Sequence, residues 1–203
     1  MEKNKFKKIC VSILGPLGDV VNTSPIFRRL RECYPKAEIC IITTSRGLEA
    51  TYGIPEIDKR FVYSKSEKCF SAIKEIIKFK NFTQKTDLYI VLDNSFRAGI
   101  LSFISGAKVR CGRKGQCKEI FLTHYIEYKN EELNEEMPVY DHYYRILKPL
   151  GIYDNKNKTS FTYSKEDKEV AENLLNKVCT TNKPKLGICL FTAEFAKSVD
   201  IPV

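Results

Sequence analysis

Short, unbroken runs of apolar residues recur along the chain and are rich in valine and isoleucine. Such runs are typical of strands that are buried on both faces of a parallel sheet. Turn-forming residues or charged segments separate each run from the next. The predicted strands cover residues 9–14, 37–43, 60–63, 88–92, 108–111 and 185–190.

Between the predicted strands, apolar residues recur every three or four positions, as they do on one face of an amphipathic helix. We expect Gly151 to end one such helix in the left-handed conformation, and residues 164–167 to form a capping box for another. The alternation of strand and helix predicts an α/β fold with a Rossmann-like parallel sheet. The predicted buried faces comprise Ile26, Leu30 and Cys33; Phe70, Ile73 and Ile77; part of residues 95–105; Tyr140, Tyr143, Leu147 and Leu150; and Val170, Leu174 and Val178.

Residues 15–19 (GPLGD) follow the first predicted strand and form a sharp, glycine-bearing turn. Ligands of open α/β sheets bind outside the carboxyl ends of the strands, so this turn is expected at a ligand site. Asp19 is the only ionisable residue of the turn. From these residues alone, Asp19 is equally well interpreted as a carboxylate that contacts a ligand and as a cap of the next helix. The turn has neither the glycine spacing of a dinucleotide fingerprint nor the lysine of a P-loop.

The chain has 34 lysines and arginines against 25 acidic residues, which gives a net charge of +9. Such an excess favours anionic partners, namely nucleic acid, a membrane surface or a phosphorylated substrate, and a generic basic surface explains it equally well. The sequence has no zinc-finger or basic-zipper signature and no aromatic-rich basic motif of an RNA-binding domain. Nucleic acid is therefore not an expected partner.

Eight cysteines occur without any CxxC pair, and several lie inside the apolar patterns, namely Cys10, Cys33, Cys40 and Cys189. This placement predicts reduced, buried cysteines rather than disulfides or a zinc site. No run approaches the roughly 20 apolar residues of a membrane helix. The apolar run after the basic first residues is too short for a signal peptide, so we expect a cytoplasmic protein.

Several segments match one enzyme family in the expected order along nearly the whole chain. The most specific is Leu17-Gly18-Asp19-Val20-Val21, followed by Thr23-Ser24-Pro25. With these segments the chain resembles glycosyltransferase family 9, the bacterial lipopolysaccharide heptosyltransferases. The weaker matching segments are Tyr34-Pro35, Asp87-Leu88 with Leu92-Asp93, Gly106-Ala107-Lys108 with Gly112, and Leu147-Lys148-Pro149-Leu150-Gly151.

The resemblance implies a GT-B fold, in which two Rossmann-like domains face a cleft. It implies that residues 1–163 form the amino-terminal, acceptor-binding domain. Residues 164–203 would then be the interdomain helix and the start of a donor domain that is largely missing, because a second domain needs on the order of 100 further residues. We therefore expect little activity from this chain alone.

The implied reaction moves a heptose or related sugar from a nucleotide-sugar, commonly ADP-heptose, to a lipid-linked inner-core acceptor. The implied place is the inner face of the cytoplasmic membrane, with peripheral contact to its surface. Neither a metal nor a cofactor is expected. The alternative hypothesis is a non-catalytic basic module that binds anionic glycolipid or nucleic acid.

The resemblance also implies roles for particular residues. Asp19 corresponds to the base that takes the proton of the acceptor hydroxyl, and Gly18 beside it lets the acceptor approach the backbone. The basic residues that match carboxylates and phosphates of the acceptor are Arg97, Arg110, Arg113 and Lys114, although a generic basic surface is the simpler explanation for them. The donor phosphates are assigned to Thr192 and Lys197, in the segment TAEFAK.

Three further polar residues are not assigned catalytic roles. We expect Asp93 to cap the helix that starts at Ser95 rather than to line the cleft. His142 is assigned to a helix face, and neither His124 nor His142 pairs with a serine or cysteine in a catalytic pattern.

Overall fold

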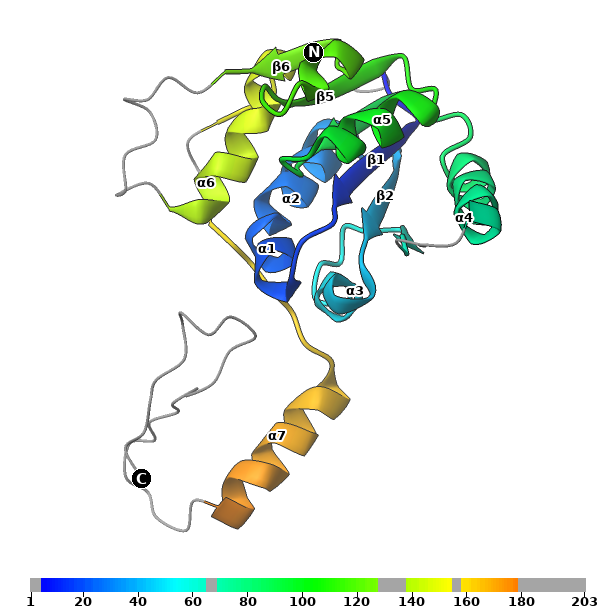
Figure 1. Ribbon diagram of the computed structural model, residues 1–203. Coiled ribbons are helices and arrows are strands. Elements are labelled where there is room, and N and C mark those ends of the chain that lie inside the picture. Colours follow the sequence, from blue (N-terminus) through cyan, green and yellow to red (C-terminus); the bar gives the residue numbers. More distant parts are fainter. Residues whose placement is uncertain (1–4, 65–68, 128–137, 155–157, 179–203) are drawn as a thin grey trace, which may run out of the picture. The chain divides into compact units, whose positions relative to one another are not determined.

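The computed structural model describes residues 5–64, 69–127, 138–154 and 158–178, and it divides the chain into two compact units, Met1–Thr162 and Tyr163–Val203. Within the described residues, six parallel strands form one sheet in the order β3-β2-β1-β4-β5-β6 (Figure 1). This order confirms the predicted Rossmann-like fold. The strands are β1 (Lys8–Ile13), β2 (Glu38–Thr43), β3 (Lys59–Val62), β4 (Leu88–Val91), β5 (Val109–Arg113) and β6 (His124–Ile126).

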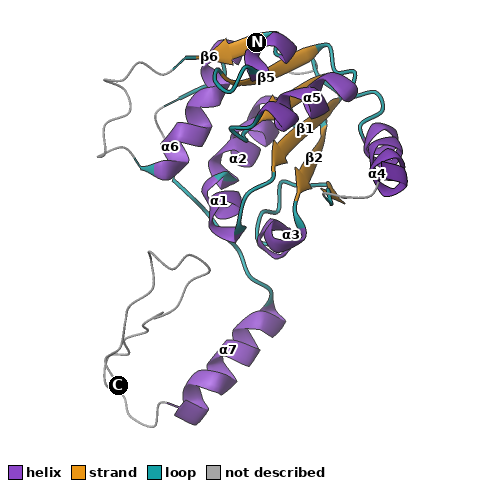
Figure 2. Ribbon diagram, in the orientation of Figure 1, coloured by secondary structure: helices purple, strands orange, loops and turns teal. Residues whose placement is uncertain are grey.

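Helices cover both faces of the sheet in the first unit (Figure 2). They are α1 (Leu17–Asn22), α2 (Ser24–Cys33), α3 (Ser45–Thr51), α4 (Cys69–Phe82), α5 (Phe96–Ile104) and α6 (Val139–Tyr144), with the 3-10 helices η1 (Lys118–Phe121) and η3 (Arg145–Leu150). Tyr163–Val203 contains α7 (Lys165–Val178). Side chains of α1, α2, α6 and η3 pack on one face, and those of α4, α5 and the residue after η1 pack on the other.

The strands at the centre of the sheet follow directly from the sequence pattern. β1 and β4 pair in register from Ile9 with Leu88 to Ser12 with Val91, and all four residues are buried. Two buried faces require near-continuous apolar runs, and this requirement is why the pattern predicted these strands correctly. Gly151 ends η3 with φ +69°, as predicted. Ser164 and Asp167 form the predicted capping box, with the Asp167 N–H donating to Ser164 Oγ at 3.0 Å.

Several predictions about the helices were wrong. The turn at residues 15–19 is shorter than expected, because α1 begins at Leu17. In α4, Ile73 and Ile77 are exposed, and the buried side chain is Phe79, which contacts Phe61 and Tyr89 in the core. The exposed isoleucines and the buried Phe79 lie on different faces of α4, so periodicity could not decide which face meets the sheet. In α7 every described side chain is exposed, including the predicted buried set Val170, Leu174 and Val178.

The sequence pattern also missed α3, η1 and β6. Gly112 and Arg113 belong to β5, beyond the predicted strand at 108–111, and Lys118 begins η1 and is buried. The predicted strand at 185–190, Cys189 and the side chain of Phe70 lie outside the described residues. Among the described cysteines, Cys10, Cys40 and Cys111 are buried, Cys33 is half-buried and Cys117 is exposed, and all are free.

Candidate functional site

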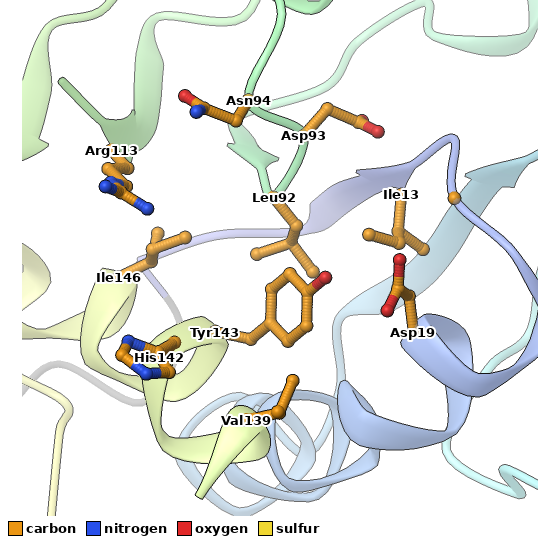
Figure 3. A pocket seen from close by; sticks show the side chains of 11 residues that line it. Ile13, Asp19, Leu92, Asp93, Asn94, Arg113, Val139, His142, Tyr143 and Ile146 are labelled. Carbon is orange, nitrogen blue, oxygen red and sulfur yellow. The ribbon is translucent and has the colours of Figure 1, made fainter. Parts of the chain in front are cut away.

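A cavity of about 340 Å³ opens at the carboxyl ends of β1, β4 and β5, where parallel α/β sheets bind their ligands (Figure 3). Four parts of the chain that are distant in sequence meet there: the link from β1 to α1, the residues after β4, the end of β5, and helix α6 with the start of η3. The wall combines carboxyl, guanidinium, imidazole and phenol groups with aliphatic side chains. The lining residues are Ile13, Gly15, Asp19, Leu92, Asp93, Asn94, Arg113, Val139, His142, Tyr143 and Ile146.

Asp19 lies in the first turn of α1 and lines this cavity. The N-cap of α1 is Pro16, and no side chain makes a capping hydrogen bond at that end. The Asp19 carboxylate is therefore stabilised by the dipole of α1, but it does not cap the helix through a hydrogen bond. It packs against Gly15, where an added Cβ atom would lie 2.7 Å from Asp19 Oδ2. Gly15 thus leaves the space that the carboxylate occupies.

Helix α6 supplies the wall opposite Asp19. In Figure 3 the Tyr143 ring stands between α6 and the strand ends, with its hydroxyl directed toward the side of Asp19. Burial raises the pKa of Tyr143 to about 12, and the negative charges of Asp19 and Asp93 and a hydrogen bond with Asp19 act in the same direction. The phenol therefore keeps its proton over the physiological range. His142 lines the same wall, where burial and then the charge of Arg113 lower its pKa.

The end of β4 contributes Asp93 and Asn94 to the cavity. Asp93 Oδ1 accepts a hydrogen bond from the Leu14 N–H at 2.6 Å, and burial raises the pKa of the Asp93 carboxyl. The prediction that Asp93 caps α5 was wrong, because Ser95 Oγ takes that role by accepting the Ala98 N–H at 3.3 Å. Ser95 occupies the N-cap position, whereas Asp93 lies two residues before it and instead ties the end of β4 to the residue after β1.

Lys118 is a buried lysine behind this part of the wall. Its ammonium donates to the carbonyl oxygen of Asp93, and to Asn94 Oδ1 at 3.4 Å. Burial lowers the pKa of Lys118 to about 8, while the negative charge of Asp93 acts in the opposite direction. The sequence pattern did not identify Lys118 as a buried residue. The signal that it missed is Gly99, where an added Cβ atom would lie 2.7 Å from the Lys118 Cβ atom.

The basic residues predicted to bind the acceptor separate into different environments. Arg113, at the end of β5, lines the cavity. Arg110 donates to the carbonyl oxygens of Phe121 and Ala107, each at 2.6 Å, which is a structural arrangement. Lys114 forms an ion pair of 2.9 Å with Glu127. Arg97 is an exposed residue of α5.

The remaining predicted site residues lie away from the cavity wall or outside the described part of the chain. Gly18 is exposed on α1, and an added Cβ atom there would meet nothing within 4 Å. Thr192 and Lys197 lie outside the described residues. The candidate site therefore comprises the cavity with Asp19, Tyr143, Arg113 and the end of β4.

Comparison with known proteins gives both sequence and structural relatives, although no family model matches. Over 123 residues the chain is 26% identical to lipooligosaccharide heptosyltransferase 2 of Haemophilus ducreyi, a match that covers 60% of this chain and 35% of that protein. The glycosyl transferase family 9 structure from Veillonella parvula has a TM-score of 0.73 at 24% identity, covering 90% of this chain and 52% of that one. The ADP-heptose lipopolysaccharide heptosyltransferase II of E. coli has a TM-score of 0.65 at 17% identity, covering 86% and 51%.

The chain thus spans about half the length of these solved relatives and about a third of the curated one. The structural matches agree with the predicted fold, and the sequence match is to a heptosyltransferase. Together they confirm that the chain resembles the amino-terminal portion of family 9 glycosyltransferases.

Proposed function

We propose, from this likeness to family 9 glycosyltransferases, that the chain is the acceptor-binding part of an enzyme that transfers a heptose or related sugar. The donor is a nucleotide-sugar, ADP-heptose first among the candidates, and the acceptor is a lipopolysaccharide inner-core saccharide. The observation that carries the proposal is Asp19, which lines a cavity at the carboxyl end of β1 together with Arg113 and Tyr143.

In the proposed reaction, Asp19 accepts the proton of an acceptor hydroxyl as its oxygen attacks the anomeric carbon of the donor. The bond from that carbon to the nucleotide diphosphate breaks, and the diphosphate leaves as an anion. A positioned base contributes roughly a hundred- to ten-thousand-fold to such a rate. The Tyr143 phenol, which stays protonated, lines the wall opposite Asp19 and is proposed to donate a hydrogen bond to the carboxylate.

Anionic groups on the acceptor are assigned to Arg113, because a guanidinium binds carboxylates and phosphates with two parallel hydrogen bonds. The donor phosphates are assigned to Thr192 and Lys197, as the family resemblance implies. The mechanism needs neither a metal nor a cofactor. The protein is proposed to work in the cytoplasm, in peripheral contact with the inner membrane surface, where a lipid-linked acceptor is available.

The test separates binding from transfer. Binding of a heptose-deficient core saccharide to the 203-residue chain is measured by calorimetry, for the native sequence and for Asp19→Asn and Arg113→Gln. Transfer of radiolabelled heptose from ADP-heptose is measured with the full product of the gene. We expect Asp19→Asn to bind the acceptor and to lose on the order of 10² to 10⁴ in transfer rate. Arg113→Gln is expected to weaken acceptor binding.

Equal transfer by the native protein and Asp19→Asn would remove Asp19 from the mechanism. Acceptor binding without transfer in any form of the protein would instead favour the non-catalytic module that binds anionic glycolipid.

A further inference from the structure

Helix α5 and the 3-10 helix η1 expose a group of large apolar side chains on the outside of the first unit. Phe96 is 44% exposed, Phe103 is 60% exposed and Ile120 is 71% exposed. The Phe121 ring lies between the two phenylalanines of α5, with ring centroids 5.4 Å from Phe96 and 6.0 Å from Phe103. We call these four residues the α5 patch. Contiguous exposed apolar groups of this kind mark interaction surfaces.

The α5 patch is held in place by the fold. Arg110 donates to the Phe121 carbonyl oxygen, and its guanidinium lies 5.7 Å from the centroid of the Phe103 ring. Gly99 brings η1 close to α5, since an added Cβ atom would lie 3.0 Å from the Phe121 ring and 2.7 Å from Lys118. The exposed rings therefore belong to a packed arrangement of two elements.

Basic residues flank the phenylalanines of the α5 patch along the chain. Arg97 and Lys108 are exposed on α5 and just after it, and α5 contains no acidic residue. Glu119 of η1 accepts a hydrogen bond from the Gly115 N–H at 3.2 Å, on the side of the preceding turn. Exposed aromatic rings beside arginine and lysine match the two chemistries of an anionic bilayer surface, an apolar interior and negative headgroups.

Helix α4 adds further exposed apolar and basic residues on the same side of the sheet. Phe79 of α4 and Leu101 of α5 belong to one core cluster, so both helices cover one face. The outward residues of α4 are apolar and basic, with Ile73 and Ile77 exposed beside Lys74 and Lys78. On the opposite layer, the exposed large apolar side chains among the described residues include Leu17 of α1, Tyr52 after α3 and Val139 of α6, which belong to separate elements.

We propose that the α5 patch docks the protein on the surface of a bilayer that contains anionic lipids. This inference rests on the proposed function, because the acceptor there is lipid-linked and its saccharide must reach the cavity from the membrane. The patch begins two residues from the cavity wall, since Asn94 lines the cavity and Phe96 starts α5. An acceptor whose lipid stays in the bilayer therefore presents its saccharide beside Asp19 and Arg113.

The chain contains no tryptophan, so a single introduced tryptophan reports its own environment without background. Phe103→Trp places the reporter in the α5 patch. Tyr52→Trp is the matched control: Tyr52 is 62% exposed, follows α3 on the opposite layer and also has an arginine guanidinium over its ring, that of Arg60 at 4.8 Å. Both variants of the 203-residue chain are mixed with vesicles of phosphatidylcholine, or of phosphatidylcholine and phosphatidylglycerol in equal parts.

We expect the emission of Phe103→Trp to shift to the blue with the anionic vesicles and much less with phosphatidylcholine alone. The emission of Tyr52→Trp should stay unchanged. In sedimentation with the anionic vesicles, the double variant Phe96→Ser/Phe103→Ser should bind about tenfold or more weakly than the native chain, and Arg97→Gln roughly fivefold more weakly. Circular dichroism checks that each variant keeps the native fold, as expected for exposed positions.

Three outcomes overturn the inference: no shift of Phe103→Trp with anionic vesicles, an equal shift of both reporters, and a shift that follows protein concentration without vesicles. The last would mean that a second copy of the chain covers the patch. The vesicles hold no acceptor and no donor, so this result is independent of Asp19. A loss of the transferase proposal would leave vesicle binding measurable, and a failure of vesicle binding would leave the effect of Asp19→Asn unchanged.

Discussion

Replacing Gly15 by alanine tests directly whether the Asp19 carboxylate is positioned by the fold. An alanine Cβ atom at this position would lie 2.7 Å from Asp19 Oδ2 and 3.2 Å from the Asp19 Cβ atom. All three of its nearest neighbours belong to Asp19. Gly15 has no positive φ angle, so the backbone tolerates alanine and the steric conflict is with this one side chain.

The effect on stability is expected to be small. Ordinary contacts begin near 3.4 Å, so the carboxylate must retreat by about 0.7 Å. Turning Asp19 away from its rotamer costs about 0.5–1.5 kcal/mol. Replacing glycine by alanine in a compatible conformation raises the free energy of unfolding by about 0.4–1 kcal/mol, because alanine lowers the conformational entropy of the unfolded chain. These two effects nearly cancel, so we expect the free energy of unfolding of Gly15→Ala to stay within about 1 kcal/mol of the native value.

The effect on function is expected to be much larger. A displacement of a catalytic group by about an ångström costs on the order of 10²-fold in rate, or about 2.7 kcal/mol in the barrier. Gly15→Ala should therefore lose most transfer activity while unfolding in urea at nearly the native midpoint. Acceptor binding should change less than transfer, because the carboxylate acts mainly in the transition state.

Asp19→Ala provides the control background for this measurement. Without the Asp19 side chain the conflict disappears, so Gly15→Ala should there raise the free energy of unfolding by about 0.4–1 kcal/mol. The difference between the two backgrounds is the coupling energy of the pair. Equal stability changes in both backgrounds, or native transfer rates in Gly15→Ala, would refute the positioning of Asp19 by this contact.

Four further variants test the groups around the cavity. Arg113→Gln should weaken acceptor binding measured by calorimetry by roughly tenfold, and added salt should reduce the difference; a native affinity would exclude Arg113 from the acceptor site. Arg110→Gln should instead lower the free energy of unfolding by about 1–3 kcal/mol, because it leaves two carbonyl oxygens without their donor. Lys118 has a folded pKa lowered to about 8, so the native chain should gain stability as pH rises from about 8 to 10, when only the unfolded state still holds this proton, and Lys118→Met should lack that gain in urea titrations. Tyr143 has a folded pKa raised to about 12, so its contribution to stability should be lost as pH rises above about 10, and Tyr143→Phe should lose less stability there than the native chain does.

The sequence predicted the sheet well because burial on both faces leaves little choice of residue. It also placed Asp19 at a ligand site after the first strand, and Asp19 does line the cavity, because a carboxylate that closely follows a buried strand is a local feature. The cavity wall that α6 forms opposite Asp19 could not be predicted in the same way. Tyr143 fits the apolar period of its own helix, and only the packing of α6 against the strand ends makes it face Asp19.

The basic residues illustrate the same limit of prediction from sequence. Arg110, Arg113 and Lys114 are close in sequence and look alike there, yet only Arg113 lines the cavity. In a strand, successive side chains point to opposite faces, and the end of β5 decides which residue reaches the ligand side. Composition indicates a basic surface, whereas the position of each residue along β5 decides which arginine lines the cavity.

Helix α5 explains why a lysine is buried beside this cavity. Gly99 lets η1 approach α5 closely enough that Lys118 lies beneath the helix and reaches the end of β4, where it binds the Asp93 carbonyl oxygen. The same approach places Phe121 between the exposed rings of α5. One close helix contact therefore builds both the floor of the cavity and the α5 patch. The hydrogen bonds of the Lys118 ammonium to the Asp93 carbonyl oxygen and to Asn94 Oδ1 therefore connect η1 to two residues that line the cavity.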